Sequence, residues 1–220
     1  MINIVFEGAP GAGKTSIITE VVKRLNKCGI SVGNTIDLDP TTPLYPVLRD
    51  MTDRTPLVVS NENFDTVLYE TLLQMSDYFY QRDRILSQNN DINIFDRAYF
   101  SIYAYQKVLL EEKYGNECHE LLKNILNILK FKTMKIDIVF YFKDKDNYYL
   151  ERAQKRNNKK FTDYEIDTLN LFDKELSNFI QKEKGYEIID VKNDDYETVV
   201  DMIFKKIKDC YEQKINKNIL

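Results

Sequence analysis

The chain has 220 residues, of which 43% are hydrophobic and 30% charged, and its formal net charge is −4 at pH 7. This length suits one sizeable core, so we expect a single domain over 1–220, and the negative balance argues against general nucleic-acid binding. Three cysteines at long spacings, one histidine, no signal peptide and no apolar run of membrane-spanning length predict a cytoplasmic protein without disulfides, a zinc site or a membrane partner.

A short strand and a phosphate-binding loop open the chain. Residues 2–6 are mostly apolar, and residues 8–15 fit the pattern G-x-x-x-x-G-K-[ST] of a P-loop. Glycines let backbone N–H groups converge on phosphate oxygens, Lys14 would reach the β- and γ-phosphates of a nucleotide, and Thr15 would ligate Mg²⁺. The helix that begins near Lys14 adds the partial positive charge of its N-terminus. The predicted ATP-binding residues of this loop are Gly8, Ala9, Pro10, Gly11, Ala12, Gly13, Lys14, Thr15 and Ser16.

Apolar periodicity and turn residues predict the elements that follow the P-loop. A loop with three prolines comes directly after the second strand, which places it at the carboxyl edge of the sheet, where open α/β sheets bind ligands. The elements predicted next are a helix over 16–27, a strand over 30–36, the proline-rich loop over 37–46, a short helix over 47–51, an irregular stretch over 52–63, a helix over 64–87 and a strand over 92–95.

Asp96 and Arg97 follow the strand at 92–95. A carboxylate at the end of an apolar strand is where a P-loop enzyme places its second magnesium-supporting residue. A carboxylate buried there without a partner would be costly, so we predict that Asp96 belongs to a metal site.

The second half of the chain continues the alternation and carries a basic helix. Arg152, Lys155, Arg156 and Lys159 recur at helical spacing, so they share one face, and we predict a phosphate-closing lid over about 144–163. The predicted elements are helices over 99–111, 118–131 and 144–158, a strand over 136–142, a helix that includes 169–179, a strand over 186–191, a helix over 196–211 and a fraying end over 214–220.

Five short strands that alternate with helices predict an α/β fold with three layers, in which helices cover both faces of a five-stranded parallel sheet. The guanine-reading motif N-K-x-D of a GTPase is absent, and 220 residues leave little room for the arm domains of a larger ATPase. A P-loop with a basic lid suits phosphoryl transfer to a small acceptor, because this chemistry depends on positioning, on neutralising phosphate charge and on excluding water.

Four stretches carry a family resemblance: the P-loop with its strand, DPTTPL at 39–44, DRAYFSIYAYQ at 96–106 and ERAQKR at 151–156. In order and spacing they resemble the thymidylate kinase family of nucleoside monophosphate kinases, along nearly the whole chain. The resemblance implies a P-loop NTPase fold and transfer of the ATP γ-phosphate to a pyrimidine deoxynucleotide, with dTMP preferred. It also implies a homodimer, for which the apolar helix faces around Leu68 and Ile102 are candidates. Gly11 in the P-loop, together with arginines in the predicted lid, resembles the pattern of the bacterial subtype of this family.

The resemblance also implies roles for single residues. Lys14 and Thr15 would hold ATP and Mg²⁺, Asp96 would support the metal, Arg97 would bind the phosphate of the acceptor, and Arg152 and Arg156 would close over the transferring group, with Arg152 also binding ATP. The acceptor-binding residues that we predict are Asp39, Arg49, Gln74, Tyr78, Arg82, Arg97, Ser101 and Tyr105.

Three positions depart from the family pattern. Pro10 stands where the family usually has an acidic residue that meets the sugar 3′-hydroxyl. Gln74 and Tyr78 stand where an ungapped alignment of the helix over 64–87 expects a base-stacking Phe and a base-reading Arg. If the alignment is shifted by one helical turn, Tyr78 and Arg82 stand at those two positions instead.

Other readings of the P-loop stay open. The chain also resembles the deoxynucleoside kinase family, which shares the fold, and there Gln74 would read the base and Asp37 or Asp39 would be the general base for a hydroxyl acceptor. A relative that phosphorylates another small alcohol is a third reading. From a different class, the chain could be a nucleotide-binding module that has lost turnover, although Lys14 and Asp96 argue against that reading.

Overall fold

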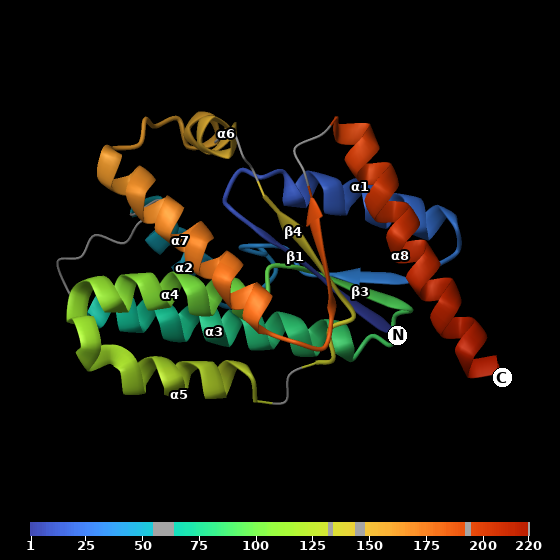
Figure 1. Cartoon of the computed structure of the whole chain (residues 1–220), viewed down its shortest axis with the longest axis horizontal. Helices are drawn as coiled ribbons and strands as arrows, with labels where there is room; N and C mark the ends of the chain where they lie inside the picture. Colours follow the sequence, from blue (N-terminus) through green and yellow to red (C-terminus); the bar gives the residue numbers. More distant parts are fainter. Residues whose placement is uncertain (55–63, 132–133, 144–147, 192–194, 220) are drawn as a thin grey trace.

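The sheet is parallel throughout, and helices cover both of its faces. A computed structural model of the chain describes residues 1–54, 64–131, 134–143, 148–191 and 195–219. The five strands lie in the order β2-β3-β1-β4-β5, which confirms the predicted three-layer architecture (Figure 1). The elements are β1 (Ile2–Gly8), α1 (Lys14–Lys27), β2 (Val32–Asn34), α2 (Tyr45–Arg54), α3 (Phe64–Leu86), β3 (Ile92–Asp96), α4 (Tyr99–Tyr114), the 3-10 helix η1 (Gly115–Cys118), α5 (His119–Leu129), β4 (Ile138–Phe142), α6 (Tyr148–Asn157), α7 (Asp163–Lys182), β5 (Glu187–Val191) and α8 (Tyr196–Ile219).

Strand β1 is the central strand, and all seven of its residues are buried. Strands β3 and β4 pair with it on either side, so neighbouring strands protect it at both edges and helices cover it on both faces. The register aligns Phe6 of β1 with Asp96 of β3. The carboxyl end of β3 therefore lies beside the point where β1 passes into the P-loop.

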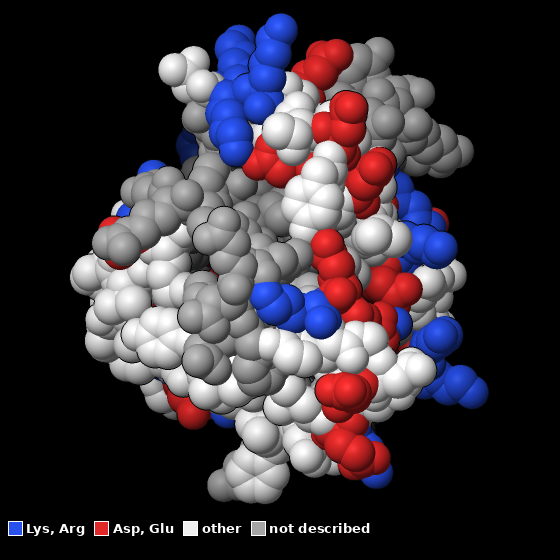
Figure 2. All heavy atoms as spheres, turned by 90° about the vertical axis from the view of Figure 1, so that its left-hand side faces the viewer, with Lys and Arg blue, Asp and Glu red and all other residues white. Residues whose placement is uncertain are grey.

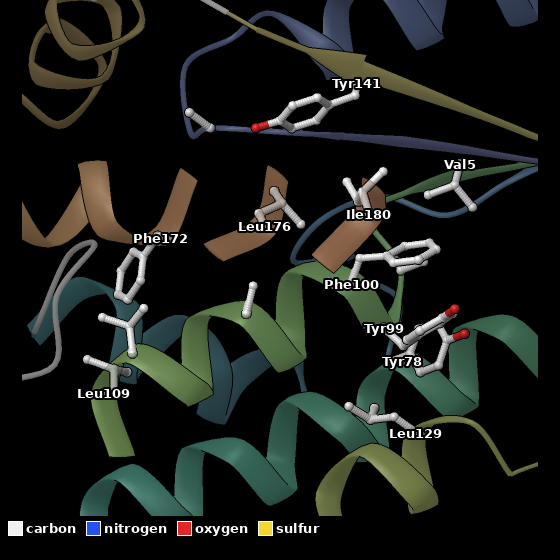
Figure 3. Packing of buried hydrophobic residues seen from close by; sticks show 14 of the residues in the cluster. Val5, Tyr78, Tyr99, Phe100, Leu109, Leu129, Tyr141, Phe172, Leu176 and Ile180 are labelled. Carbon is white, nitrogen blue, oxygen red and sulfur yellow. The ribbon is translucent and has the colours of Figure 1, made fainter. Parts of the chain in front are cut away.

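Apolar side chains fill two cores, one on each face of the sheet. Ile4 and Phe6 point to the face that α1 and α8 cover, whereas Val5 points to the face that α3, α4, α5 and α7 cover, because successive side chains of a strand alternate. Figure 3 shows Val5, Phe100 and Ile180 packed together in the second of these cores. This core is continuous with the walls of the functional cavity described below.

Most predicted elements are confirmed within a few residues, but β2 is shorter than predicted and α2 begins earlier. Strand β2 has three residues instead of the predicted seven. The helix expected at 47–51 begins earlier, at Tyr45, so Pro46 lies in its first turn, where a missing N–H costs nothing. The predictions at 55–63 and 144–147 fall outside the described residues.

The prediction that the C-terminal residues fray is wrong for residues 214–219. Helix α8 continues to Ile219, and Lys214 Nζ lies 3.2 Å from Asp137 Oδ1, so the end of the helix is tied to the start of β4. Among the helices that the structure describes, none combines the length and the apolar character that a membrane crossing needs.

Candidate active site

The P-loop closes around the side chain of its own lysine. Lys14 is buried, and its Nζ donates hydrogen bonds to the backbone oxygens of Gly8, at 2.9 Å, and Ala9, at 3.0 Å. Burial, followed by the nearby positive charge of Arg97, lowers the pKa of Lys14 to about 7. A phosphate bound in the loop would favour the charged form of Lys14, so the loop is suited to hold an anion.

Gly11 brings the P-loop against helix α6. Its φ of +85° lies in the left-handed region that glycine tolerates. A Cβ added at this position would lie 2.5 Å from the backbone oxygen of Tyr149 and 3.2 Å from Cβ of Ala153. Only a residue without a side chain therefore allows this contact between the loop and α6.

Thr15 and Asp96, the two predicted metal ligands, lie in contact with each other. Thr15 Oγ1 donates to Asp96 Oδ2 at 2.6 Å, and Asp96 N donates to Thr35 Oγ1 at 3.0 Å. Burial raises the pKa of the Asp96 carboxyl. Asp96 Oδ1 is buried, and no donor among the described residues reaches it. A hydroxyl and a carboxylate oxygen that lacks a partner fit Mg²⁺, which prefers oxygen ligands and keeps phosphate and water in its other positions.

Arg97 lies where β3 ends and faces several acceptors. Its φ of +72° is unusual for a residue with a side chain. Its Nε lies 3.0 Å from Asp37 Oδ2, which makes an ion pair at the mouth of the site. Its Nη1 donates to the Gly8 oxygen at 3.1 Å, Ser101 Oγ at 3.0 Å and Tyr105 Oη at 3.0 Å.

Glu7 supports this arrangement from below, and the sequence analysis missed it. Its fully buried carboxylate accepts a hydrogen bond from Ala98 N at 2.8 Å and another from Ser101 Oγ. Burial raises the pKa of Glu7 to about 7, against the opposing influence of Arg97. A carboxylate directly after the apolar run Ile4–Phe6 of a buried strand was the signal that could have found it.

A cavity of about 480 Å³ joins the P-loop to side chains of the three helices α3, α4 and α7. Helices α3 and α4 run side by side in opposite directions, because Thr71 meets Gln106 whereas Tyr78 lies beside Tyr99 (Figure 3). Ser101 and Tyr105 line the cavity near Arg97, and Leu109 lines it about two turns of helix farther on. We call the part around the P-loop, Asp96 and Arg97 the phosphate end, and the part around Leu109 the distal end.

Apolar side chains and one polar pair line the distal end. Leu109 of α4 and Leu169 and Phe172 of α7 form its apolar walls, and Phe172 also packs against the ring of Tyr105, with the ring centroids 4.6 Å apart. Glu70 and Gln74 of α3 line the same cavity, and Gln74 Nε2 donates to Glu70 Oε1 at 2.8 Å. The sequence analysis did not identify Glu70, Leu109 or Phe172, because their place depends on how three helices cross.

The structure gathers some predicted acceptor-binding residues at the cavity and leaves others away from it. Of the described residues, those that line it include Gln74, Tyr78, Arg97, Ser101 and Tyr105, but not Asp39, Arg49 or Arg82.

These last three residues lie in other surroundings. Asp39 is buried and accepts a charged hydrogen bond from Arg84 Nη2 at 2.5 Å. The guanidinium of Arg82 lies 4.8 Å from the ring centroid of Phe79, and Arg49 is exposed. Their predicted roles stay predictions.

The residues of the predicted basic lid lie in different surroundings, and the lid itself stays a prediction. Arg152 of α6 lines the cavity, and Lys159 pairs with Glu165 at 2.6 Å. Figure 2 shows Lys and Arg side chains gathered at the top of one face, in the region of α6 and the residues after it, where Lys155 and Lys159 are exposed. The side chain of Arg156 is outside the described part of the structure.

Comparisons with known proteins agree with this geometry. A family model described as "Thymidylate kinase" matches residues 6–203. A relative from Sulfurisphaera tokodaii named "Probable thymidylate kinase" is 31% identical over 153 residues, which are 69% of this chain and 68% of the relative.

Solved structures share the fold at lower identity. A thymidylate kinase from Candida albicans superposes with a TM-score of 0.65 at 19% identity, covering 94% of this chain and 91% of that chain. A deoxyadenosine kinase from M. mycoides with bound dATP gives a TM-score of 0.64 at 18% identity, covering 94% of this chain and 100% of that chain. At these identities the likeness concerns the fold alone.

Proposed function

The chain belongs to the thymidylate kinase family and is a nucleotide kinase, and we propose that it transfers the γ-phosphate of ATP to a deoxynucleoside monophosphate, dTMP by preference. The observation that carries the proposal is a cavity that joins a P-loop to a distal end with apolar walls. The phosphate end suits the charged groups of both substrates, and the distal end suits a flat base.

Different residues of the phosphate end hold different phosphate groups of the two substrates. The P-loop amides and Lys14 hold the β- and γ-phosphates of ATP, and Arg97, at the mouth of the distal end, holds the phosphate of the acceptor. Arg152 reaches the cavity from α6 and adds positive charge near the transferring group. A phosphate acceptor is already ionised, so the transfer needs no general base.

Magnesium is the metal that this site would hold, through Thr15 Oγ1 and the carboxylate of Asp96. When bound, Mg²⁺ supplies positive charge to the phosphate oxygens. The chain's own contribution is the pairing of Thr15 with Asp96, which places both oxygens next to the P-loop. This role rests on Asp96 Oδ1, which no donor in the described part of the chain reaches.

A deoxynucleoside kinase is the second candidate, and the position of Asp37 favours it. The Asp37 carboxylate lines the cavity beside Arg97, and its side chain is 51% exposed, so it could accept a proton from an acceptor hydroxyl.

The test is ATP consumption with magnesium across deoxynucleosides and their monophosphates, with the products resolved by chromatography. We expect turnover with monophosphates, and with dTMP above all. Turnover only with nucleosides would replace the proposal with the second candidate. ATP binding without any turnover would overturn both and would leave a nucleotide-binding module.

A further inference from the structure

The polar pair at the distal end has a fixed orientation. Gln74 Nε2 donates to Glu70 Oε1 at 2.8 Å, and both residues are half-buried in the cavity wall, one helical turn apart on α3. An ionised carboxylate only accepts hydrogen bonds, so it admits only the NH₂ group of the glutamine. The carboxyl of Glu70 therefore determines which way the amide of Gln74 turns.

The orientation leaves the amide oxygen of Gln74 for a ligand, beside the second hydrogen of Nε2. No donor among the described residues reaches Gln74 Oε1, so this atom is a hydrogen-bond acceptor in the wall of the cavity. A second glutamine of the same helix behaves differently, since Gln81 Nε2 donates to Asp77 and Gln81 Oε1 accepts from Ile36 N at 3.3 Å. Both ends of the Gln81 amide are thus occupied within the protein.

Gln106, on the facing helix, also has its amide oxygen engaged within the protein. Gln106 Oε1 lies 2.5 Å from Thr71 Oγ1, which also lies 2.7 Å from the backbone oxygen of Val67. Gln81 and Gln106 therefore both have a protein partner at the amide oxygen, whereas no donor among the described residues reaches Gln74 Oε1.

We propose that Glu70 is a specificity-determining residue, which holds Gln74 Oε1 toward the acceptor and thereby selects bases with an N–H at ring position N3. Thymine and uracil carry this donor, whereas cytosine in the same seat would place a nitrogen lone pair against Gln74 Oε1. The inference rests on the proposed function for the identity of the ligand class, a pyrimidine deoxynucleotide. Glu70 acts through Gln74 and is a positioning residue.

Burial supports the assignment. It raises the pKa of Glu70 to about 7, and Gln74 is the partner that opposes this rise. A half-buried carboxylate with one amide partner holds that partner firmly, because neither group has full access to water. Measurements at pH 8 keep Glu70 ionised and therefore restricted to accepting.

The test is calorimetric binding of dTMP, dUMP and dCMP at pH 8 to the full chain and to Glu70→Gln. The neutral variant keeps the shape of Glu70 but accepts either orientation of Gln74. We expect the wild type to bind dTMP and dUMP at least about 10-fold more tightly than dCMP, and Glu70→Gln to lower that ratio by about 10-fold, which equals about 1.4 kcal/mol. Glu120→Gln, which removes an exposed charge from α5, should leave the ratio unchanged.

A double variant separates this role from a merely structural one. In a Gln74→Leu background, Glu70→Gln should no longer change the ratio, because the group that Glu70 orients is gone. Glu70→Met, which also leaves the Gln74 amide without its partner, serves if Glu70→Gln fails to fold.

The binding measurements test the inference about Glu70, and turnover tests the proposed function. Equal affinities of the wild type for dTMP and dCMP would overturn the inference, as would a ratio that Glu70→Gln leaves intact. Selective binding of dTMP without phosphoryl transfer would instead overturn the proposed function and support the inference.

Discussion

The two ends of the cavity are built in different ways. The phosphate end comes from contiguous residues at the carboxyl edges of β1 and β3, and much of it is backbone. The distal end comes from side chains of α3, α4 and α7, which are far apart in the sequence. The first end depends on local conformation, whereas the second depends on how helices pack. The contrast predicts that changes at the phosphate end abolish the reaction, while changes at the distal end redirect it.

The largest effect should come from Lys14→Ala. Removing the buried ammonium takes away the group that meets the transferring phosphate, so we expect kcat to fall at least about 100-fold while the melting temperature shows a folded protein. Lys23→Ala on the same helix is the matched control, because Lys23 is exposed and pairs with Glu20, its neighbour on that helix. A variant at Lys14 with full activity would contradict the P-loop assignment.

Arg97→Ala should act at the boundary between the two ends. A charged hydrogen bond to phosphate contributes about 1.5–3 kcal/mol, so we expect KM for the acceptor to rise about 10- to 100-fold, with little change in KM for ATP. Initial rates at varied concentrations of each substrate measure both constants. Equal losses for ATP and acceptor would show that Arg97 serves the whole phosphate end, and Arg97→Lys provides a second variant that keeps the charge.

A smaller effect, on stability, should come from Glu7→Gln. The folded-state pKa of Glu7, about 7, lies above its ordinary value of 4.5, so the folded state binds more protons between these values. The stability that this proton contributes is complete below pH 4.5 and is lost as pH rises through about 7. The glutamine can still accept from Ala98 N but cannot titrate.

Chemical denaturation at pH 5 and pH 8 measures this difference for Glu7. Each pKa unit corresponds to about 1.4 kcal/mol, so the wild type should lose on the order of 1–3 kcal/mol more than Glu7→Gln between the two values. Equal losses in both proteins would show that the carboxyl of Glu7 does not titrate in this range.

The sequence predicted the residues of the phosphate end far better than those of the distal end. Local conformation builds the phosphate end, whereas the packing of distant helices builds the distal end. The spacing from Gly8 to Thr15 determines a loop conformation, and Asp96 follows a strand whose burial the sequence reveals. Glu70 and Phe172 belong to the cavity only because α3 and α7 face each other across α4, which no local pattern encodes. Gln74 was identified through a family resemblance and not through its surroundings.

Predictions from local sequence patterns also missed features that involve contacts between residues far apart in the chain. The lysine-rich C-terminus has the composition of a fraying end, yet Lys214 meets Asp137 and the helix continues. Glu7 escaped notice because its partners, Ala98 and Ser101, are more than 90 positions away in the chain.

The close approach of Gly11 to α6 has an evolutionary consequence. A mutation that gives position 11 a side chain needs a shift of the α6 backbone near Tyr149 and Ala153, because the shortest contact is with a backbone oxygen that no substitution removes. A lineage that keeps α6 where it is cannot recruit a cationic side chain at position 11. In this chain the positive side chain that reaches the cavity beside Gly11 comes from α6, as Arg152.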